Sequence, residues 1–496
     1  MASVTKVLVA NRGEIALRVM RTCREMGIPA VAVYAEPDAR SPHAVFADER
    51  AVLSGATPRQ AYLDSEQLVR IAREHGADAI HPGYGFLSEN PAFAEACVNN
   101  RLTFIGPPAT SMRAMGDKVE ARRRMIAAGV PVVPGTTALA DEAAAISEAK
   151  RIGYPVMVKA AAGGGGIGMR VAKGPDDLPA AFEACRRAAQ SSFGSPDVYL
   201  ERYLEHPRHI EMQILADDQG TTVALGEREC SIQRRHQKLL EETPAVGLSA
   251  SRRRAMAEAA VKAAAAVAYR NAGTIEFIVS GEEFYFLEMN TRLQVEHPVT
   301  ESVLGIDLVR EQIRLARGER IPDSGYPQPR GHAIEFRINA EDPLRNFMPT
   351  PRRVQRYAPP SGPGVRVDSG IRPHQEISPH FDSLLLKLIV WADDRESAIG
   401  RGRRALQEFV LTGPKTTIPF HRALLEEPDF HAGRISTSFI QDHPSLLERT
   451  QEFEAQHSPF ESLYGAGEVA AAIAPAWSLA RRLSGRPPGR GTPRPG

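Results

Sequence analysis

Short apolar runs alternate with amphipathic stretches over roughly the first hundred residues, and this alternation restricts the possible fold more than any other feature. Strand-like runs span residues 6–10, 30–35 and 77–81, and stretches with helical apolar spacing span residues 15–26 and 66–75. Strands separated by helices form a parallel sheet with right-handed crossovers, which binds ligands at the carboxyl ends of its strands. We therefore expect a Rossmann-like first domain. Residues 11–12 and 81–85 fall at its ligand-facing edge, although the glycines there are equally consistent with ordinary turns.

The composition changes at two points further along the chain. Prolines at 131 and 134 precede a helical stretch at 141–152, and a Pro-rich segment covers residues 321–330. Residues 200–300 are rich in strand-forming sequence, interrupted by an Ala-rich helical stretch at 251–269. The 496 residues leave room for roughly three domains of about 150 residues each. Beyond Arg481 the chain is rich in Gly, Pro and Arg without apolar periodicity, so we expect disorder there.

The overall composition excludes several classes of protein. A net charge of +1 predicts no attraction to nucleic acid or to an anionic membrane. No apolar run reaches the ~18 residues that a membrane helix needs, and the run at residues 6–10 is too short for a signal-peptide core. The four cysteines form no CxxC pair, so we expect free thiols rather than disulfides or a zinc site. These features favour a cytoplasmic globular enzyme.

A glycine run at residues 163–168 connects two strand-like segments, 155–160 and 169–172. It lacks the Gly-Lys-Ser/Thr ending of a Walker loop, and a strand rather than a helix follows it. A glycine run between antiparallel strands forms a flap whose N–H groups can approach phosphate oxygens closely. Lys159, inside the preceding apolar strand, adds a positive charge. A phosphate-binding flap and a simple flexible hairpin tip are both consistent with this pattern.

Residues 273–279 and 284–290 have the pattern of a β-hairpin. If Gly281–Glu283 form a three-residue loop, Glu276 lies directly opposite Glu288, with Asn290 further along the same face. Like charges at facing positions are destabilising, and a divalent cation removes that repulsion. Carboxylate and amide oxygens suit Mg²⁺ or Mn²⁺. In the alternative register, both glutamates would lie solvated on an outer face.

Two densely charged segments accompany this hairpin, at residues 290–298 and 233–242. Such segments are ordinarily solvated faces. Because the first is continuous with the predicted metal site, we favour a small-anion pocket. A guanidinium and an ammonium can bind a carboxylate or bicarbonate there, and a neighbouring carboxylate can accept a proton.

Taken together, several segments resemble biotin carboxylase, the ATP-grasp component of biotin-dependent carboxylases. They are residues 81–90, 115–118, 163–169, 233–238, 288–297 and 337–342. The resemblance covers residues 4 to 445 and implies an α/β and α+β architecture: a Rossmann-like pre-ATP-grasp domain, an ATP-grasp domain with a mobile glycine-rich lid, and a biotin carboxylase C-terminal domain. The implied bounds are 1–115, 116–320 with the lid at about 131–203, and 330–445, followed by a tail at 446–496.

The resemblance also implies a role for each matching residue. ATP would be bound by Lys118, Lys159 and His209, by Glu201, Arg202, Tyr203 and Leu204 around the adenine, by Gln233 and His236 around the ribose and phosphates, and by Gly165 and Gly166 in the flap. Glu276, Glu288 and Asn290 would hold the metal. Lys238, Arg292 and the backbone of Val295 would hold bicarbonate, and Glu296 would be its base. Arg337 would contact the ureido oxygen of biotin, beside Tyr84.

The implied reaction is ATP- and bicarbonate-dependent carboxylation of biotin through carboxyphosphate. The chain contains no Met-Lys-Met biotin attachment site, so a separate biotin carboxyl carrier protein and carboxyltransferase are expected, and the resemblance implies a homodimer. Acetyl-CoA carboxylase is the favoured parent complex, ahead of a two-subunit pyruvate carboxylase or a propionyl-CoA type enzyme. Another ATP-grasp ligase and a catalytically silent scaffold remain alternatives. Ile167 and residues 348–353 and 374–381 depart from the family pattern.

Overall fold

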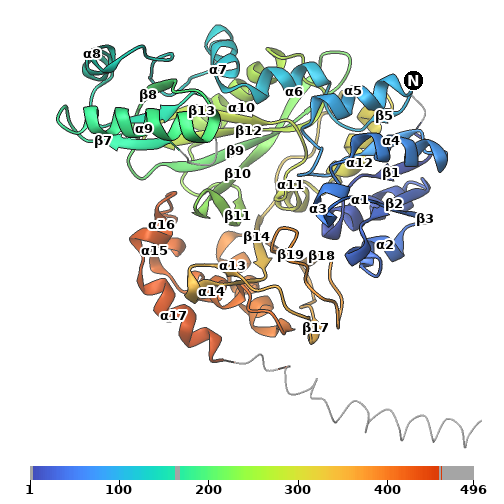
Figure 1. The fold of residues 1–496 in the computed structure, drawn as a ribbon. Helices are drawn as coiled ribbons and strands as arrows, with labels where there is room; N and C mark the ends of the chain where they lie inside the picture. The colour runs from blue at the N-terminus through green and yellow to red at the C-terminus, as the bar shows by residue number, and fades with distance from the viewer. Residues whose placement is uncertain (1–3, 162–167, 457–459, 461–496) are drawn as a thin grey trace, which may run out of the picture.

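The computed structural model describes residues 4–161, 168–456 and 460 (Figure 1). Its N-terminal part, in blue, contains a five-stranded parallel sheet of order β3-β2-β1-β4-β5, as the strand–helix alternation predicts. Its strands are β1 (Val7–Val9), β2 (Ala30–Tyr34), β3 (Glu49–Val52), β4 (Ala79–His81) and β5 (Thr103–Phe104). Its helices are α1 (Gly13–Glu25), α2 (Pro42–Phe46), α3 (Pro58–Ala61), α4 (Ser65–Glu74), α5 (Pro91–Asn99) and α6 (Ala109–Gly116).

The predicted ligand edge of this sheet is built around one side chain. Asn11 follows β1, and its amide donates hydrogen bonds to the carbonyls of Pro82 (2.7 Å) and Tyr84 (2.8 Å), which follow β4. Gly83 has a φ of +63°, and a Cβ there would meet the Asn11 side chain at 2.9 Å, so glycine is required at this approach. Asn11 thereby fixes the loop that carries Tyr84.

A small antiparallel sheet of order β7-β6-β8 forms a separate layer with two helices, seen in teal and green at the left of Figure 1. Its elements are α8 (Glu142–Ile152), β6 (Val156–Ala160), β7 (Met169–Ala172), α9 (Leu178–Phe193) and β8 (Val198–Arg202). We call this unit the lid. Its apolar residues, among them Val158, Phe182 and Leu200, form a core of their own. The antiparallel pairing of the strands that flank the glycine run confirms the expected hairpin, although residues 162–167 lie outside the described residues.

The largest sheet has eight antiparallel strands in the order β13-β12-β9-β10-β11-β14-β19-β18. They are β9 (Arg208–Ala216), β10 (Thr222–Arg234), β11 (Gln237–Thr243), β12 (Asn271–Ser280), β13 (Glu283–Asn290), β14 (His332–Asn339), β18 (Val365–Ser369) and β19 (Leu384–Ala392). The pairing of β11 with β14 joins strands from either side of the Pro-rich segment into one sheet. Side chains from both regions can therefore meet on one face.

The remaining elements cover this sheet or extend its C-terminal end. They are α7 (Lys118–Ala127), α10 (Ala250–Ala265), α11 (His297–Leu304), α12 (Leu308–Ala316), β15 (Glu341–Asp342), β16 (Met348–Pro349), β17 (Arg356–Ala358), α13 (Arg395–Glu408), β20 (Val410–Thr412), α14 (Ile418–Leu424), α15 (Pro428–His431), α16 (Phe439–Asp442) and α17 (Ser445–Glu454). Helix α11 contacts β10, β11, β14 and β19 and lies near the centre of the molecule in Figure 1. The segment that precedes it is thus placed where the N-terminal, central and C-terminal parts meet.

Across the described part of the chain, no helix is both long enough and apolar enough to span a bilayer. The four cysteines are buried and free, as expected. The prediction of disorder beyond Arg481 concerns residues outside those that the structure describes.

Candidate active site

The hairpin of β12 and β13 brings the two predicted carboxylates together, by a route that differs from the expected one. Ser280 pairs with Glu283, so the turn contains two residues instead of three. A shift in register then leaves Leu287 without a partner, and Glu276 lies directly opposite Glu288. The predicted loop was wrong and the predicted pair is present, because this β-bulge restores the register that the shorter turn removes.

The carboxylate of Glu276 is buried and held from several sides. Its Oε1 accepts hydrogen bonds from Lys238 (2.9 Å), Asn290 (2.8 Å) and Gln294 (2.9 Å). Nε2 of His209 lies 3.0 Å from its other oxygen. Burial alone would raise the pKa of Glu276, but the positive charges of Lys238 and His209 outweigh it and hold that pKa well below its usual value.

Glu288 lies on the edge strand, and its side chain is exposed. Partial desolvation and the negative charge of Glu276 raise the pKa of Glu288, against the smaller effect of Lys118. Within the described residues, no cationic side chain forms an ion pair with Glu288. A divalent cation between the two carboxylates would remove their repulsion, and Asn290 could add an amide oxygen, so this set fits Mg²⁺ or Mn²⁺.

A second group of possible metal ligands also includes Glu276. His209, Glu211 and Glu276 offer ligand atoms within 4.8 Å of one another, and all three are buried. Glu211, however, already accepts hydrogen bonds from Arg228 and Lys238. Glu211 therefore already has two cationic partners, whereas Glu288 forms no ion pair with a cation among the described residues, which makes the Glu276–Glu288 pair the better cation site.

Lys238 is the centre of a network of charges on one face of the large sheet. Its Nζ donates to Glu211 (2.6 Å), Glu276 (2.9 Å) and Glu296 (2.7 Å). We call Lys238, these three glutamates and Arg228 the central charge cluster. Burial alone would lower the pKa of Lys238, but the three carboxylates raise it well above its usual value, so the ammonium stays charged.

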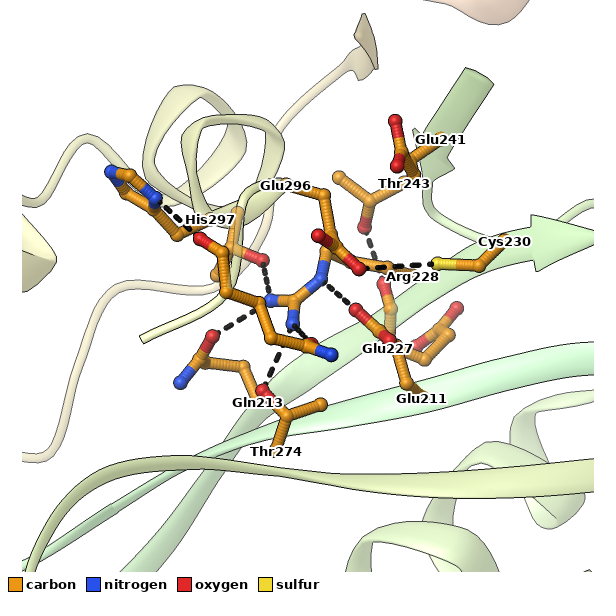
Figure 2. A network of polar contacts seen from close by, with 12 residues as sticks. Glu211, Gln213, Glu227, Arg228, Cys230, Glu241, Thr243, Thr274, Glu296 and His297 are labelled. Atoms are coloured by element: carbon orange, nitrogen blue, oxygen red, sulfur yellow. Dashed lines mark hydrogen bonds and ion pairs between the residues drawn. The ribbon is translucent and has the colours of Figure 1, made fainter. Parts of the chain in front are cut away.

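Figure 2 shows Arg228, which the sequence did not single out, enclosed by polar side chains. It is fully buried, and its guanidinium donates to Glu211, Gln213 (2.7 Å), Thr274 (3.1 Å), Gln294 (2.8 Å) and Thr300 (3.0 Å). A guanidinium has five N–H donors in a fixed plane, so these contacts fix the orientation of the surrounding side chains. Arg228 thus ties β9, β10 and β12 to the segment before α11 and to α11 itself.

Glu296 lies between Lys238 and Arg337. One oxygen accepts from Lys238, and the other from Nη2 of Arg337 at 2.9 Å. Nε of Arg337 also donates to Glu241 at 2.6 Å. Burial would raise the pKa of Glu296, but Lys238 and Arg337 hold it far below its usual value. Burial raises the pKa of Glu241 to about 7, against the opposing charge of Arg337.

Arg292 lies at the edge of this network and is partly buried. Its Nη2 donates to Oδ1 of Asn290 at 2.8 Å, and its Nε donates to Glu89 at 2.8 Å. Glu89 also accepts from the backbone and hydroxyl of Thr291. The guanidinium is therefore next to the predicted metal ligand rather than turned away from it, and it is held there by a glutamate from the N-terminal sheet's loops.

The residues predicted around the nucleotide lie on or next to the lid, at the start of α7, and on or beside strands of the large sheet. Lys159 forms an ion pair with Glu201 within the lid sheet. Arg202 contacts Glu283 (2.7 Å) and Tyr285 across to β13. The other predicted members are distributed as follows: Tyr203 and Leu204 are half-buried, Gln233 is buried, and Lys118 and His236 are exposed. Gly165 and Gly166 lie outside the described residues.

Tyr84, predicted beside biotin, and Val295, predicted beside bicarbonate, lie where the N-terminal and C-terminal parts meet. The hydroxyl of Tyr84 donates to Glu14 on α1. The backbone carbonyl of Val295 accepts a hydrogen bond from Lys387 on β19 at 2.8 Å. Thus Tyr84 and Val295 are connected through two residues that the sequence did not single out, Glu14 and Lys387.

The sequence nevertheless contains a signal for some of the missed residues. In residues 209–213, polar or charged residues alternate with apolar ones inside a strand, and residues 227–229 are three consecutive charged residues inside another strand. Both patterns normally mark a solvated face. Here Glu211, Gln213 and Arg228 are fully buried, because α11 and the segment before it cover that face.

Comparison with protein families accounts for this arrangement. The models for the biotin carboxylase N-terminal domain, the carbamoyl-phosphate synthase L chain ATP-binding domain and the biotin carboxylase C-terminal domain match residues 3–112, 117–324 and 335–442. The chain belongs to the biotin carboxylase family. This confirms the resemblance drawn from the motifs and the three-part fold expected from it.

Curated relatives and solved structures agree with this family. A pyruvate carboxylase subunit of Methanothermobacter thermautotrophicus is 52% identical over 443 residues, which cover 88% of this chain and 90% of that protein. Biotin carboxylase of Nostoc sp. is 52% identical over 440 residues, covering 88% and 98%. The biotin carboxylase domain of Hydrogenobacter thermophilus 2-oxoglutarate carboxylase, solved with MgADP, ADP and bicarbonate, superposes with a TM-score of 0.84 at 46% identity and covers 89% and 98%.

Proposed function

We propose that this chain is an ATP-dependent carbon–nitrogen ligase that converts ATP, bicarbonate and a biotinylated carrier protein into ADP, phosphate and the carboxybiotinylated carrier. The observation that carries the proposal is the convergence of Lys238, Glu296 and Arg337 beside the facing carboxylates Glu276 and Glu288. Members of the family solved with MgADP and bicarbonate support these ligands.

In this proposal the nucleotide lies between the lid and the large sheet. Lys159 and Lys118 neutralise phosphate charge, with His209 beside the metal ligands and the backbone of residues 201–204 around the adenine. Glu276, Glu288 and Asn290 hold Mg²⁺ or Mn²⁺, which neutralises charge on the phosphates when bound. Phosphoryl transfer depends on positioning and charge neutralisation, which this set of residues provides.

Bicarbonate would bind between Lys238, Arg292 and the backbone of Val295, with Glu296 as its base. At rest, Lys238 and Arg337 keep the pKa of Glu296 too low for an efficient base. A bound anion would interact with Lys238, and biotin would interact with Arg337, so both cations would stabilise the Glu296 carboxylate less. The proton affinity of Glu296 would therefore rise as the substrates bind. A bicarbonate oxygen then attacks the γ-phosphorus and displaces ADP, which gives carboxyphosphate.

Carboxyphosphate would break down to CO₂ and phosphate next to biotin. The phosphate removes the N1′ proton, and N1′ then attacks CO₂. Arg337 stabilises the negative charge that develops on the ureido oxygen. Because the intermediate hydrolyses in water, the lid must exclude solvent before it forms.

The test is bicarbonate-dependent ADP release by the purified chain, with and without free biotin. Changing Arg292 or Glu296 to Ala should abolish this turnover and leave the dissociation constant for ADP within about threefold, roughly 0.7 kcal/mol, because neither residue is assigned to the nucleotide. An equal loss of ADP binding would show that the roles are misassigned. Biotin-independent turnover that requires a carboxylate and an amine would favour another ATP-grasp ligase, and ADP binding without turnover would favour a silent scaffold.

The partners and parent complex are also part of the proposal. A biotin carboxyl carrier protein and a carboxyltransferase would complete the reaction, with the chain itself as a homodimer. Acetyl-CoA carboxylase is our first choice of parent complex, and a two-subunit pyruvate carboxylase or a propionyl-CoA type enzyme is the alternative. The relatives include, at equal identity, a biotin carboxylase and a subunit of pyruvate carboxylase. We propose domain bounds of 1–115, 116–320 with the lid at about 131–203, and 330–445.

A further inference from the structure

Lys387 is a fully buried lysine in the middle of β19, and none of the roles above includes it. A buried ammonium is unfavourable unless its charge is neutralised and its N–H groups are hydrogen-bonded. Its Nζ donates to the carbonyl of Val295 at 2.8 Å and lies 3.3 Å from a carboxylate oxygen of Glu14. It also lies 5.8 Å from the centre of the Tyr84 ring. The ammonium therefore contacts the N-terminal region and the segment before α11 at once.

The position of Lys387 in the sheet relates it directly to Arg337. The two residues are opposite each other on β19 and β14, so their side chains leave the same face. Facing cations repel each other unless each has its own anion or acceptor. Arg337 binds the carboxylate of Glu296, and Lys387 binds the carbonyl of Val295. The adjacent cations thus hold two consecutive residues of one segment.

The hydrogen bond to Val295 has a geometric consequence for Glu296. The carbonyl of Val295 belongs to the same planar peptide group as the N–H of Glu296. A hydrogen bond that holds this carbonyl therefore also fixes the orientation of the peptide plane that contains the Cα atom of Glu296. Glu296 also directly precedes α11, where its side chain makes no capping hydrogen bond. The orientation of the side chain therefore depends on contacts from outside the helix.

Charge neutralisation alone does not explain these contacts. Glu335 is a buried carboxylate on β14. Burial raises its pKa, and among the charged groups that lower this pKa, Lys387 has the largest effect. Yet neither oxygen of Glu335 has a hydrogen-bond partner among the described residues, while Lys387 donates to an uncharged carbonyl. A lysine that served only to neutralise buried carboxylates would donate hydrogen bonds to Glu335.

We propose that Lys387 is a positioning residue that holds the Val295–Glu296 peptide in the orientation needed for bicarbonate and its base. This inference rests on the proposed function. Glu14 and Tyr84 extend this set of contacts, because Glu14 accepts a hydrogen bond from Tyr84 and forms an ion pair with Lys387. The loop that carries Tyr84 is thereby connected to the base-bearing segment through one ammonium.

The experiment uses the full chain and the variants Lys387→Met and Lys387→Met with Glu14→Gln. Methionine keeps the length and shape of the lysine stem without its donors. Lys387→Met leaves the Glu14 carboxylate buried without its cation, and the double variant removes that carboxylate. The double variant therefore keeps the test valid if Lys387→Met alone does not fold. Arg395→Met is the matched control, since Arg395 is a partly buried cation that binds Glu242 and backbone carbonyls away from the segment 292–296.

We expect both Lys387 variants to lower kcat/KM for bicarbonate by about 100-fold, the loss that a displacement of about 1 Å produces, with the ADP dissociation constant nearly unchanged. Amide hydrogen exchange in residues 292–297 should rise in these variants and stay unchanged in Arg395→Met. A folded double variant with kcat/KM for bicarbonate within twofold of the parent would overturn the inference. Equal losses for ADP and bicarbonate would also overturn it, since they indicate general destabilisation. If the unsubstituted chain shows no bicarbonate-dependent turnover, the proposed function fails and this inference fails with it.

Discussion

The central charge cluster and the lid both contain charged side chains inside sheets, but they hold them in different ways. In the central charge cluster, Lys238 binds the carboxylates of Glu211, Glu276 and Glu296, and Arg228 and Glu211 are fully buried. In the lid, Lys159 pairs with Glu201 on the neighbouring strand, and the pair is partly open to solvent. Long-range contacts fix the cluster, whereas under the proposed function the Lys159–Glu201 pair of the lid would exchange partners when a phosphate binds.

This difference has a physical reason. A buried charge without a partner is strongly destabilising, so a buried network keeps its partners in a single arrangement. A partly exposed ion pair contributes little to stability, because water competes for both groups. Under the proposed function, the cluster would provide preorganised geometry for the chemistry, and the lid would provide a cation that binds the nucleotide.

The largest expected effect is the loss of Arg228. Arg228→Met leaves Glu211 with one cation fewer and removes donors from buried oxygens, so the free energy of opening of β9 and β10 should fall by about 3–5 kcal/mol. Hydrogen exchange of their amides under native conditions measures it. Lys159→Met is the matched lid variant, and its effect on the β6 amides should stay below about 1 kcal/mol. Similar losses in both variants would contradict the distinction between the two regions.

Acid should separate the lid from the rest of the described structure by a smaller amount. Burial lowers the pKa of His43, His81 and His421 from 6.5 to about 4, whereas the lid residues 142–202 include no histidine. Between these values the unfolded chain binds more protons, so the stability that the neutral rings provide is complete above about pH 6.5 and is lost as the pH falls towards 4. At pH 5.5 each ring should account for a loss of about 1.4 kcal/mol.

His421 offers a direct check of this acid effect. Its Nε2 donates to the carbonyl of Arg337 at 2.9 Å, and glutamine can keep a donor without titrating. Hydrogen exchange at pH 7 and 5.5, corrected for intrinsic rates, should show protection decreasing in α14 and remaining constant in α9. His421→Gln should reduce the pH dependence in α14. An unchanged pH dependence in this variant would show that the ring does not cause it.

The smallest expected effect concerns the partner of Lys159. Glu201→Gln removes the negative charge that competes with a phosphate for the ammonium, so ADP should bind about two- to threefold more tightly, roughly 0.5 kcal/mol. Isothermal titration calorimetry measures this change, with Glu283→Gln as a control for the loss of a surface carboxylate. Tenfold weaker binding in Glu201→Gln would mean that the carboxylate itself contacts the nucleotide.

The hairpin of β12 and β13 shows how much of the candidate site the sequence patterns predicted. Alternation with period two placed Glu276, Glu288 and Asn290 on one hairpin, and the pairing of the two glutamates is present in the structure. The turn was predicted one residue too long. The bulge at Leu287 compensates for the shorter turn, and a bulge depends on how the edge strand packs, which no local pattern reports.

Longer-range parts of the site were recognised only through family motifs, or were missed. Lys238, Glu296 and Arg337 were assigned through the resemblance, and Arg228, Glu211 and Lys387 were not identified. Glu211 lies in a polar–apolar alternation and Arg228 lies among consecutive charged residues, and both patterns are typical of a solvated face. Their burial depends on α11 covering that face of the sheet.

The sequence by itself determined the parallel N-terminal sheet, the strands flanking the glycine run and the hairpin with its paired carboxylates, because periodicity and turn residues act over a few neighbouring positions. The tertiary structure decided which charged faces meet. The order of strands in the large sheet places β14 beside β11 and β19 beside β14, which brings Arg337 to Glu296 and Lys387 to Val295. That order is set by the burial of whole faces and by the pairing of distant charges, and both arise only when the complete chain packs together.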